Sequence, residues 1–278
     1  MNLDAVRHFK VLMVGDAILD EYQYVTPLGK SIKEPVISVR LEGKESFKGG
    51  IWAAAAHLTD LCIRVDVMAG LKVMVNTRFV DPIYTRKLFT LHEERVRDND
   101  IGSYCHIPEY DVVVVADFGH GAMTPDLIEK LCIEAKFLAV NTQTNSQNYG
   151  FNLITKYPRA DFVVLDELEA RLAVHDRDSP IEEVILKLKH ENIIVTRGAS
   201  GAIGYDGEFH REEAGTTTVV DSMGAGDAFL AVTAPFAAAG FHMRDLVRIG
   251  NAAGAAKVGI IGHRRHVTRQ DLEERLAL

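Results

Sequence analysis

Residues 219–229 read VVDSMGAGDAF and place two acids and two glycines just before a long alanine-rich run. Glycine is costly inside a helix, so Gly224 and Gly226 must meet a need of the backbone. One interpretation is a simple strand-to-helix turn capped by Asp221 or Ser222. The other is a helix start built to hold an anion, and the two interpretations predict different chemistry.

In the second interpretation the backbone N–H groups of Gly224, Ala225 and Gly226 face an anion at the helix N-terminus. Asp227, in the first turn, is then close enough to act as a general base on a substrate hydroxyl. The segment is not a Walker A loop, because no GK[ST] follows the glycines, and it lacks the G-x-G-x-x-G spacing. The motif therefore predicts an anion site of another type.

The elements that must position this motif follow an alternating pattern. The apolar run 111–119 predicts a buried parallel strand, and residues 124–135 predict a helix that Thr124 caps. Residues 51–61 predict the first helix. This alternation indicates an α/β fold: one domain over residues 1–278, with a mostly parallel central sheet covered by helices on both faces.

Polar residues and glycines follow several of the predicted strands. In parallel sheets, ligands bind at the carboxyl ends of the strands. The residues expected at this edge, together with the opening motif, are Asp16, Asp117, Asn141, Asp166 and Gly198.

Two β-rich segments interrupt the pattern between the first strand and the first helix. Residues 22–25 and 35–43 predict a half-exposed antiparallel pair. We therefore expect residues 21–48 to contribute a small β-lid. Its apolar face would need cover, which favours a homodimer formed through the lid.

The net charge of −8 over 278 residues argues against nucleic acid as a partner. Neither a signal peptide nor a membrane-spanning segment is recognisable, so we expect a cytoplasmic protein with no membrane partner. The widely spaced Cys62, Cys105 and Cys132 are expected to be reduced core residues. His263 and His266 are interpreted as part of a basic loop, because two histidines without a third ligand rarely bind a metal.

The segment DSMGAGDAF resembles the D-T-x-G-A-G-D-x-F signature of the ribokinase-like (PfkB) carbohydrate kinases. Further segments resemble that family in consistent order along the chain: VGDAILD, FKGG, DFGHG, IIVTRGASGA and NAAGAAKVG. Within the family, VGDAILDEYQYV, TRFV and DFGHG look most like the bacterial heptose-phosphate kinase branch. The resemblance implies a ribokinase-like fold and ATP-dependent phosphorylation of a sugar or sugar-phosphate hydroxyl. It also implies a possible nucleotidyltransferase partner, as some heptose-type relatives have.

The resemblance implies a role for each matching residue. Asp227 would be the general base, and the backbone of residues 224–226 would form the anion hole. Asp20 and Asp16 would accept hydrogen bonds from sugar hydroxyls. The other implied roles are backbone approach to the substrate for Gly49 and Gly50, nucleotide phosphate and ribose contacts for Thr196, Arg197 and Gly198, adenine contact for Asn251, and Mg²⁺ support for Glu169 and Asp166.

Several of these residues also have simpler interpretations. Asp16 and Asp20 are compatible with turn or cap acids after a strand. Glu169 is compatible with a solvated helix residue. Arg197 is compatible with a surface charge, and Asn251 with the polar end of a buried helix.

The sequence departs from the family pattern at two places. Ala53, preceded by Trp52, stands where the family has a substrate-binding asparagine, which implies a changed or occluded sugar pocket. After Gly70 the chain runs directly into the next strand, without the helix and strand that the family inserts. Losing one substrate hydrogen bond costs about 1–3 kcal/mol, so an active kinase with altered substrate choice is favoured. The alternatives are a catalytically degenerate domain that binds nucleotide or sugar as a regulatory or partner module, and a purely structural interaction module.

Overall fold

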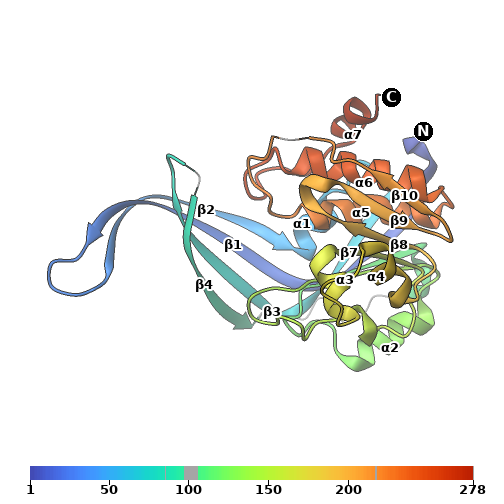
Figure 1. The fold of residues 1–278 in the computed structure, drawn as a ribbon, viewed down its shortest axis with the longest axis horizontal. Helices are drawn as coiled ribbons and strands as arrows, with labels where there is room; N and C mark the ends of the chain where they lie inside the picture. Colours follow the sequence, from blue (N-terminus) through green and yellow to red (C-terminus); the bar gives the residue numbers. More distant parts are fainter. Residues whose placement is uncertain (85, 97–105, 217, 278) are drawn as a thin grey trace.

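The computed structural model describes residues 1–84, 86–96, 106–216 and 218–277 (Figure 1). The strands are β1 (Lys10–Lys30), β2 (Ile37–Gly50), β3 (Arg64–Asp81), β4 (Arg86–Val96), β5 (Val112–Asp117), β6 (Leu138–Thr142), β7 (Phe162–Asp166), β8 (Ile193–Thr196), β9 (Ala202–Tyr205) and β10 (Phe209–Glu212). They form one sheet in the order β10-β9-β8-β7-β6-β5-β1-β3-β4, with β2 paired to β1. The strands from β8 to β3 in this order run parallel, as predicted.

The helices are α1 (Ile51–Ala56), α2 (Pro125–Glu134), α3 (Glu167–Ala173), α4 (Ile181–Leu188), α5 (Ala225–Ala238), α6 (Met243–Lys257) and α7 (Arg269–Leu276), with short 3₁₀ turns η1 (Leu3–Val6), η2 (Ile107–Glu109), η3 (Ile154–Lys156) and η4 (Gly198–Ser200). Alternate residues of β1 face opposite layers. Val11 and Met13 join the core with α1, α5, α6 and α7. Leu12 and Val14 join the core with α2, α3 and α4. Helices therefore cover both faces of the sheet (Figure 1).

The outer parts of four strands project from this body as a curved extension, which we call the ribbon (Figure 1). Its pairs β1–β2 and β3–β4 are antiparallel, and its central pair β1–β3 is parallel. The ribbon comprises β1 from Ala17, β2, β3 from Lys72, and β4. Strands β1 and β2 pair from Ala17 opposite Gly50 outward. The sequence-based lid boundaries omitted half of this extension, because β4 was not predicted and β3 is one continuous strand. Pairing of β3 with β1 shifts register after Ala69 and resumes at Val73, so β3 stays extended past Gly70 and no helix is inserted there.

Two predicted elements can be compared directly with the structure. Thr124 caps α2, and its side chain accepts a hydrogen bond from the Leu127 amide, as predicted. The first helix is shorter than predicted, because α1 ends at Ala56 instead of residue 61. Beyond it, the amide of Leu58 bonds to the carbonyl three residues earlier. The buried His57 also accepts a hydrogen bond from the distant Val267 amide, a tertiary contact that the local sequence does not reveal.

Cys62 and Cys132 are free and buried, as predicted, whereas Cys105 lies outside the described residues. Burial raises the pKa of the Cys62 thiol to about 12. Within the described parts of the chain, no helix is long and apolar enough to cross a membrane.

Candidate active site

Three adjoining pockets meet at the start of α5. The polar pocket, of 520 Å³, lies between residues 164–169, 196–198 and 224–227. The apolar pocket, of 410 Å³, lies between residues 214–216, α5 and α6. The ribbon pocket, of 200 Å³, lies between the bases of β1, β3 and β4 and the loop that follows β6. Gly226 lines the first two pockets, while Gly224 and Asp227 line the first and third, so one helix start connects all three.

The start of α5 is free of side-chain caps. Gly224 is the N-cap residue in the left-handed conformation (φ 74°), and no described side chain bonds to this helix end. Asp221 instead accepts hydrogen bonds from the Met223 and Gly262 amides. The interpretation of a turn capped by Asp221 or Ser222 is therefore wrong. A Cβ added at Gly226 would meet no atom within 4 Å, so the backbone there is open to the pocket.

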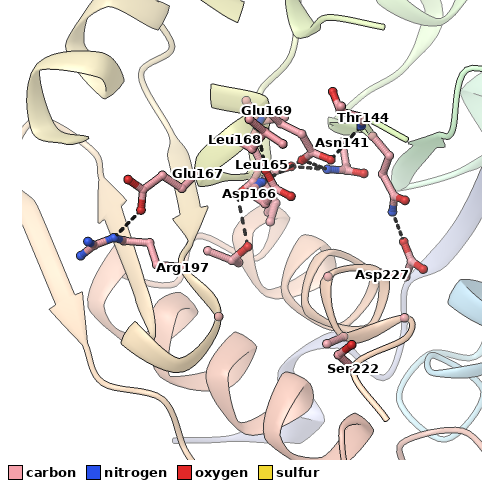
Figure 2. Close-up of a pocket in the computed structure, with 17 residues that line it drawn as sticks. Asn141, Thr144, Leu165, Asp166, Glu167, Leu168, Glu169, Arg197, Ser222 and Asp227 are labelled. Atoms are coloured by element: carbon pink, nitrogen blue, oxygen red, sulfur yellow. Dashed lines mark hydrogen bonds and ion pairs between the residues drawn. The ribbon is translucent and has the colours of Figure 1, made fainter. Parts of the chain in front are cut away.

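Asp227 is the third residue of α5, and only 8% of it is exposed. Its carboxylate accepts a hydrogen bond from Gln143 Nε2, and Figure 2 shows this contact at the edge of the polar pocket. Burial raises the pKa of Asp227 to about 6, although the charges of His263 and Lys257 and the Gln143 hydrogen bond oppose the shift. The carboxylate is thus deprotonated at neutral pH but remains a better base than an exposed aspartate.

Thr196 is the last residue of β8, Arg197 and Gly198 follow it, and all three line the polar pocket. Arg197 is not an unpaired surface charge, because its Nε lies 2.8 Å from a Glu167 carboxylate oxygen (Figure 2). Asn251, on α6, lines the apolar pocket. Its amide nitrogen donates to the backbone carbonyls at residues 212 and 213, at 3.3 and 2.9 Å. Asn251 lies inside α6 and binds the end of β10, so it does not satisfy a helix end, as the simpler interpretation had it.

Glu169 and Asp166 form a capping box at the start of α3. Glu169 is 7% exposed, so the interpretation as a solvated residue is wrong. Its oxygens accept hydrogen bonds from the backbone N–H groups of Asp166 and Thr144 and from Asn141 Nδ2 (Figure 2). Burial, reinforced by the charge of Asp166, raises the pKa of Glu169 to about 8. Beside it, Asn141 Oδ1 and Thr144 Oγ1 are buried without a hydrogen-bond partner among the described residues.

Asp20 lies in the ribbon pocket and is 2% exposed. The strand register aligns Asp20 of β1 with Asn76 of β3, and Asn76 with His92 of β4. Arg78 and His263 both pair with its carboxylate. Burial alone would raise the pKa of Asp20, but the His263 hydrogen bond and the Arg78 charge outweigh it and hold the pKa below its ordinary value.

Of the three other residues predicted to contact the substrate, Gly50 lines the ribbon pocket, whereas Asp16 and Gly49 do not. Asp16 does not line the ribbon pocket, and its two oxygens accept the Phe118 and Ala122 amides, each at 2.9 Å. A Cβ at Gly49 would lie 2.2 Å from an Asp20 oxygen, so Asp20 itself explains this glycine. Gly50 lines the pocket in the left-handed conformation (φ 55°), where a side chain would be strained.

Sequence reasoning missed most of the ribbon pocket. His263 was assigned to a basic loop, yet its Nε2 lies 3.3 Å from Asp20 Oδ2 and its side chain is 8% exposed. Ala53 is buried in the core, and Trp52 packs against that core rather than lining the pocket, so neither residue explains its shape. Arg78 and His120 lie in the segments TRFV and DFGHG but received no role from them. Besides His263, the polar lining residues outside every quoted segment are Asn76, His92, Gln143, Asn145, Ser146 and Gln147.

Residues 107–267 match the family model described as pfkB family carbohydrate kinase. The chain is 26% identical to the bifunctional protein HldE of Hyphomonas neptunium, over 94% of this chain and 62% of that protein. It is likewise 26% identical to the bifunctional protein HldE of Shewanella baltica, over 100% of this chain and 66% of that protein. The chain therefore spans a little under two thirds of the first of these relatives.

Solved structures share the fold. A ribokinase from Thermotoga maritima superimposes with a TM-score of 0.73 at 15% identity, covering 97% of this chain and 100% of that one. A nucleoside kinase of the ribokinase family from Methanocaldococcus jannaschii gives a TM-score of 0.70 at 17% identity, covering 98% of this chain and 99% of that one. The architecture is thus the predicted ribokinase-like α/β fold.

Proposed function

The chain belongs to the pfkB family of carbohydrate kinases, and on that premise we propose that it transfers the γ-phosphate of ATP to a hydroxyl of a sugar or sugar phosphate. One observation carries the proposal: three pockets of different character meet at Gly224–Asp227. A phosphotransferase needs this arrangement, because donor and acceptor must approach a single reacting phosphorus atom.

In the proposed reaction Asp227 removes the proton from the acceptor hydroxyl as its oxygen attacks the γ-phosphorus. The bond between that phosphorus and the oxygen bridging to the β-phosphate breaks, and ADP leaves. The N–H groups of Gly224, Ala225 and Gly226 stabilise the charge on the transferred group. The uncapped helix start and the elevated pKa of Asp227 both support these roles.

The polar pocket suits the phosphates and ribose of ATP, with Thr196, Arg197 and Gly198 along its wall. The apolar pocket suits the adenine base, because Phe229, Ala255 and Val258 line it beside Asn251. The two pockets share residues, so one elongated nucleotide fits across both.

Mg²⁺ would bind at the floor of the polar pocket. Among the described residues no group of three or more His, Cys, Asp and Glu side chains could hold a metal alone. Mg²⁺ commonly takes only one or two protein ligands besides waters and substrate phosphates. The unpartnered oxygens of Asn141 and Thr144, next to Asp166, fit such an ion. Glu169 would orient these residues, because protein donors engage both of its oxygens. Bound there, Mg²⁺ would neutralise phosphate charge.

The ribbon pocket would hold the acceptor. Asp20 supplies an acceptor for sugar hydroxyls, and Asn76, Gln143 and Asn145 supply neutral amide groups of the kind that pair with hydroxyls. Arg78 and the nearby histidines would also accommodate a phosphate on the sugar. A volume of 200 Å³ suits a small polyol acceptor.

One observation favours the degenerate, ligand-binding alternative. Asp20, which would bind the acceptor, is already paired with Arg78 and His263. If this pairing persists when sugars are present, the domain would bind nucleotide without turnover.

Two partners follow from the same proposal. The ribbon exposes apolar side chains, among them Ile37, Leu41 and Phe89, and a homodimer formed through it, acting as a lid, would cover them. The relatives named bifunctional are longer than this chain, which supports a nucleotidyltransferase as an attached or separate partner. Sedimentation at increasing concentration tests the dimer.

The experiment that tests the kinase is a thermal-shift screen of ADP, ATP with Mg²⁺, sugars and sugar phosphates, followed by turnover assays on the hits. We expect Mg²⁺-dependent ADP formation with at least one acceptor. Stabilisation by ATP without turnover across a broad panel would favour the degenerate alternative. Absence of nucleotide binding would refute both and leave a structural module.

A further inference from the structure

Lys257 is a buried charge that the proposed mechanism leaves without a role. It is the last residue of α6 and has 0% relative exposure. Lysine is almost never fully buried unless its ammonium group is paired, because desolvating a charge is costly. Burial accordingly lowers the pKa of Lys257. Its contacts should therefore reveal a specific function.

The ammonium group binds two backbone carbonyls from separate segments. Lys257 Nζ donates to Met223 O and to Gly262 O, each at 2.7 Å. Met223 immediately precedes Gly224, the first residue of the proposed anion hole. Gly262 immediately precedes His263, which contacts Asp20 in the ribbon pocket.

Asp221 holds the same two residues from their other side. Its Oδ1 accepts the Met223 N–H at 3.2 Å, and its Oδ2 accepts the Gly262 N–H at 2.9 Å. Met223 and Gly262 are therefore each held at the N–H by Asp221 and at the C=O by Lys257. Four hydrogen bonds from two oppositely charged side chains are more than an ordinary turn of the backbone needs.

This clamp lies against the reacting end of the site. A Cβ at Gly224 would approach Lys257 Cε at 3.3 Å and His263 Cε1 at 3.1 Å, so both side chains border the first anion-hole residue. The charged groups around the ammonium are Asp221, Asp227, Lys87, Asp20 and the imidazole of His57. Lys257 and Asp221 act through the backbone that they share, because among the described residues Lys257 forms no ion pair with an acid, and Asp221 pairs with Lys87 instead.

We propose that Lys257, together with Asp221, is a positioning residue that fixes the anion-hole loop and the His263 segment in the geometry needed for phosphoryl transfer. This inference rests on the proposed function, since it assigns Lys257 a task in that same site. A displacement of about 1 Å at a reacting centre can reduce turnover by about 100-fold, and this is the effect expected here.

The test compares Lys257→Met with wild type, using Mg²⁺-ATP hydrolysis as the turnover probe. ADP-binding sites are counted by calorimetry, so that kcat refers to folded sites only. We expect kcat per site to fall about 100-fold while KM for ATP stays within about threefold, and hydrogen exchange to quicken in residues 222–228. Unchanged kcat per site and unchanged exchange in a folded variant would overturn the inference.

Lys156→Met is the matched control, because Lys156 Nζ lies 2.6 Å from the buried Asp117 carboxylate and lines none of the three pockets. It should destabilise the protein without changing kcat per site. If Lys257→Met does not fold, Lys257→Gln takes its place, because glutamine keeps an N–H donor without the charge. A similar fall in kcat per site would support the inference, and an unchanged kcat per site would overturn it. If neither folds, slow exchange of residues 222–228 in wild type, matching that of α6, supports the clamp and rapid exchange refutes it. A wild type that neither binds ADP nor hydrolyses ATP would instead refute the proposed function, and this inference with it.

Discussion

The end of the site that we propose binds phosphate (the phosphate end) and the end that we propose binds the acceptor (the acceptor end) are built from different kinds of structure. At the phosphate end, residues 196–198 and 224–227 are short continuous segments where a strand ends or a helix begins. At the acceptor end, Asp20, Asn76 and His92 come from three strands and meet through their pairing register. The first end depends on local backbone geometry, and the second depends on long-range assembly.

This difference teaches where each end can vary. A glycine-rich helix start tolerates little change, because its N–H groups and left-handed N-cap must stay open. In a row of side chains across neighbouring strands, replacing any one side chain changes the chemistry of the row while the backbone stays the same. We therefore expect substitutions at the phosphate end to affect kcat, and those at the acceptor end to affect the choice and KM of the acceptor.

The largest effect is expected for Asp227→Asn. Loss of a general base lowers kcat by about 100- to 10,000-fold, whereas the affinity for ADP should stay within about threefold because the amide keeps the side-chain volume. Coupled-enzyme kinetics and calorimetry measure the two quantities. Asp126→Asn, in the exposed first turn of α2, is the matched control and should change neither. If both variants had a similar kcat, Asp227 would not be the general base.

At the acceptor end, Asp20→Asn should raise the acceptor KM by about 10- to 100-fold, the cost of a lost charged hydrogen bond. KM for ATP should not change. Initial rates at varied acceptor and fixed ATP provide the measurement. Glu21→Gln, at the next position of β1 and bonded to Thr77 instead, serves as the control. If Asp20→Asn raised the KM for ATP as much as the KM for the acceptor, the two ends of the site would not bind their ligands independently.

The pH dependence tests the phosphate end alone. Asp227 has a pKa of about 6, so kcat should fall about tenfold per unit as pH drops below that value and stay level above pH 7. Because this folded pKa exceeds the ordinary value of 3.8, wild type loses stability as pH rises from 3.8 to about 6, and the loss stays constant above that pH. Melting temperatures should therefore show Asp227→Asn gaining on wild type as pH rises from about 4 to about 6, with a level difference at higher pH. A constant difference between them over the lower range as well would contradict the burial argument.

The smallest effect concerns the link between the two ends. Lys87, on β4 of the ribbon, lies 3.1 Å from Asp221 Oδ1, but its side chain is 37% exposed. Water solvates Lys87, and Asp221 keeps two backbone hydrogen bonds without it, so the pair contributes about 1 kcal/mol or less and Lys87→Met should reduce kcat by about fivefold or less. Lys72→Met is the control, because it breaks an exposed ion pair between Lys72 of β3 and Glu94 of β4, which also lies in the ribbon. A 100-fold loss would show that the ribbon governs the phosphate end.

The sequence by itself determined the phosphate end and the fold class. Two glycines beside Asp227, the run 111–119 and the alternation of strands and helices are local signals, since helix starts and buried strands depend mainly on neighbouring residues. The resemblance to the carbohydrate kinases added the order of these segments. The family match and the shared fold confirm this class of protein.

Tertiary structure decided the rest of the acceptor end, where the sequence had indicated only Asp20 and Gly50. β4 carries no strong strand signal because every described residue in it is exposed, so pairing with β3 rather than burial keeps it extended. His263, Gln143 and Lys257 are brought to the site from loops and a helix end whose sequences look ordinary. Their roles depend on contacts between residues more than 30 positions apart, and no local pattern records such contacts. The fold class and the glycine-rich start of α5 are therefore predictable from short segments, whereas the ribbon pocket exists only once the chain has folded.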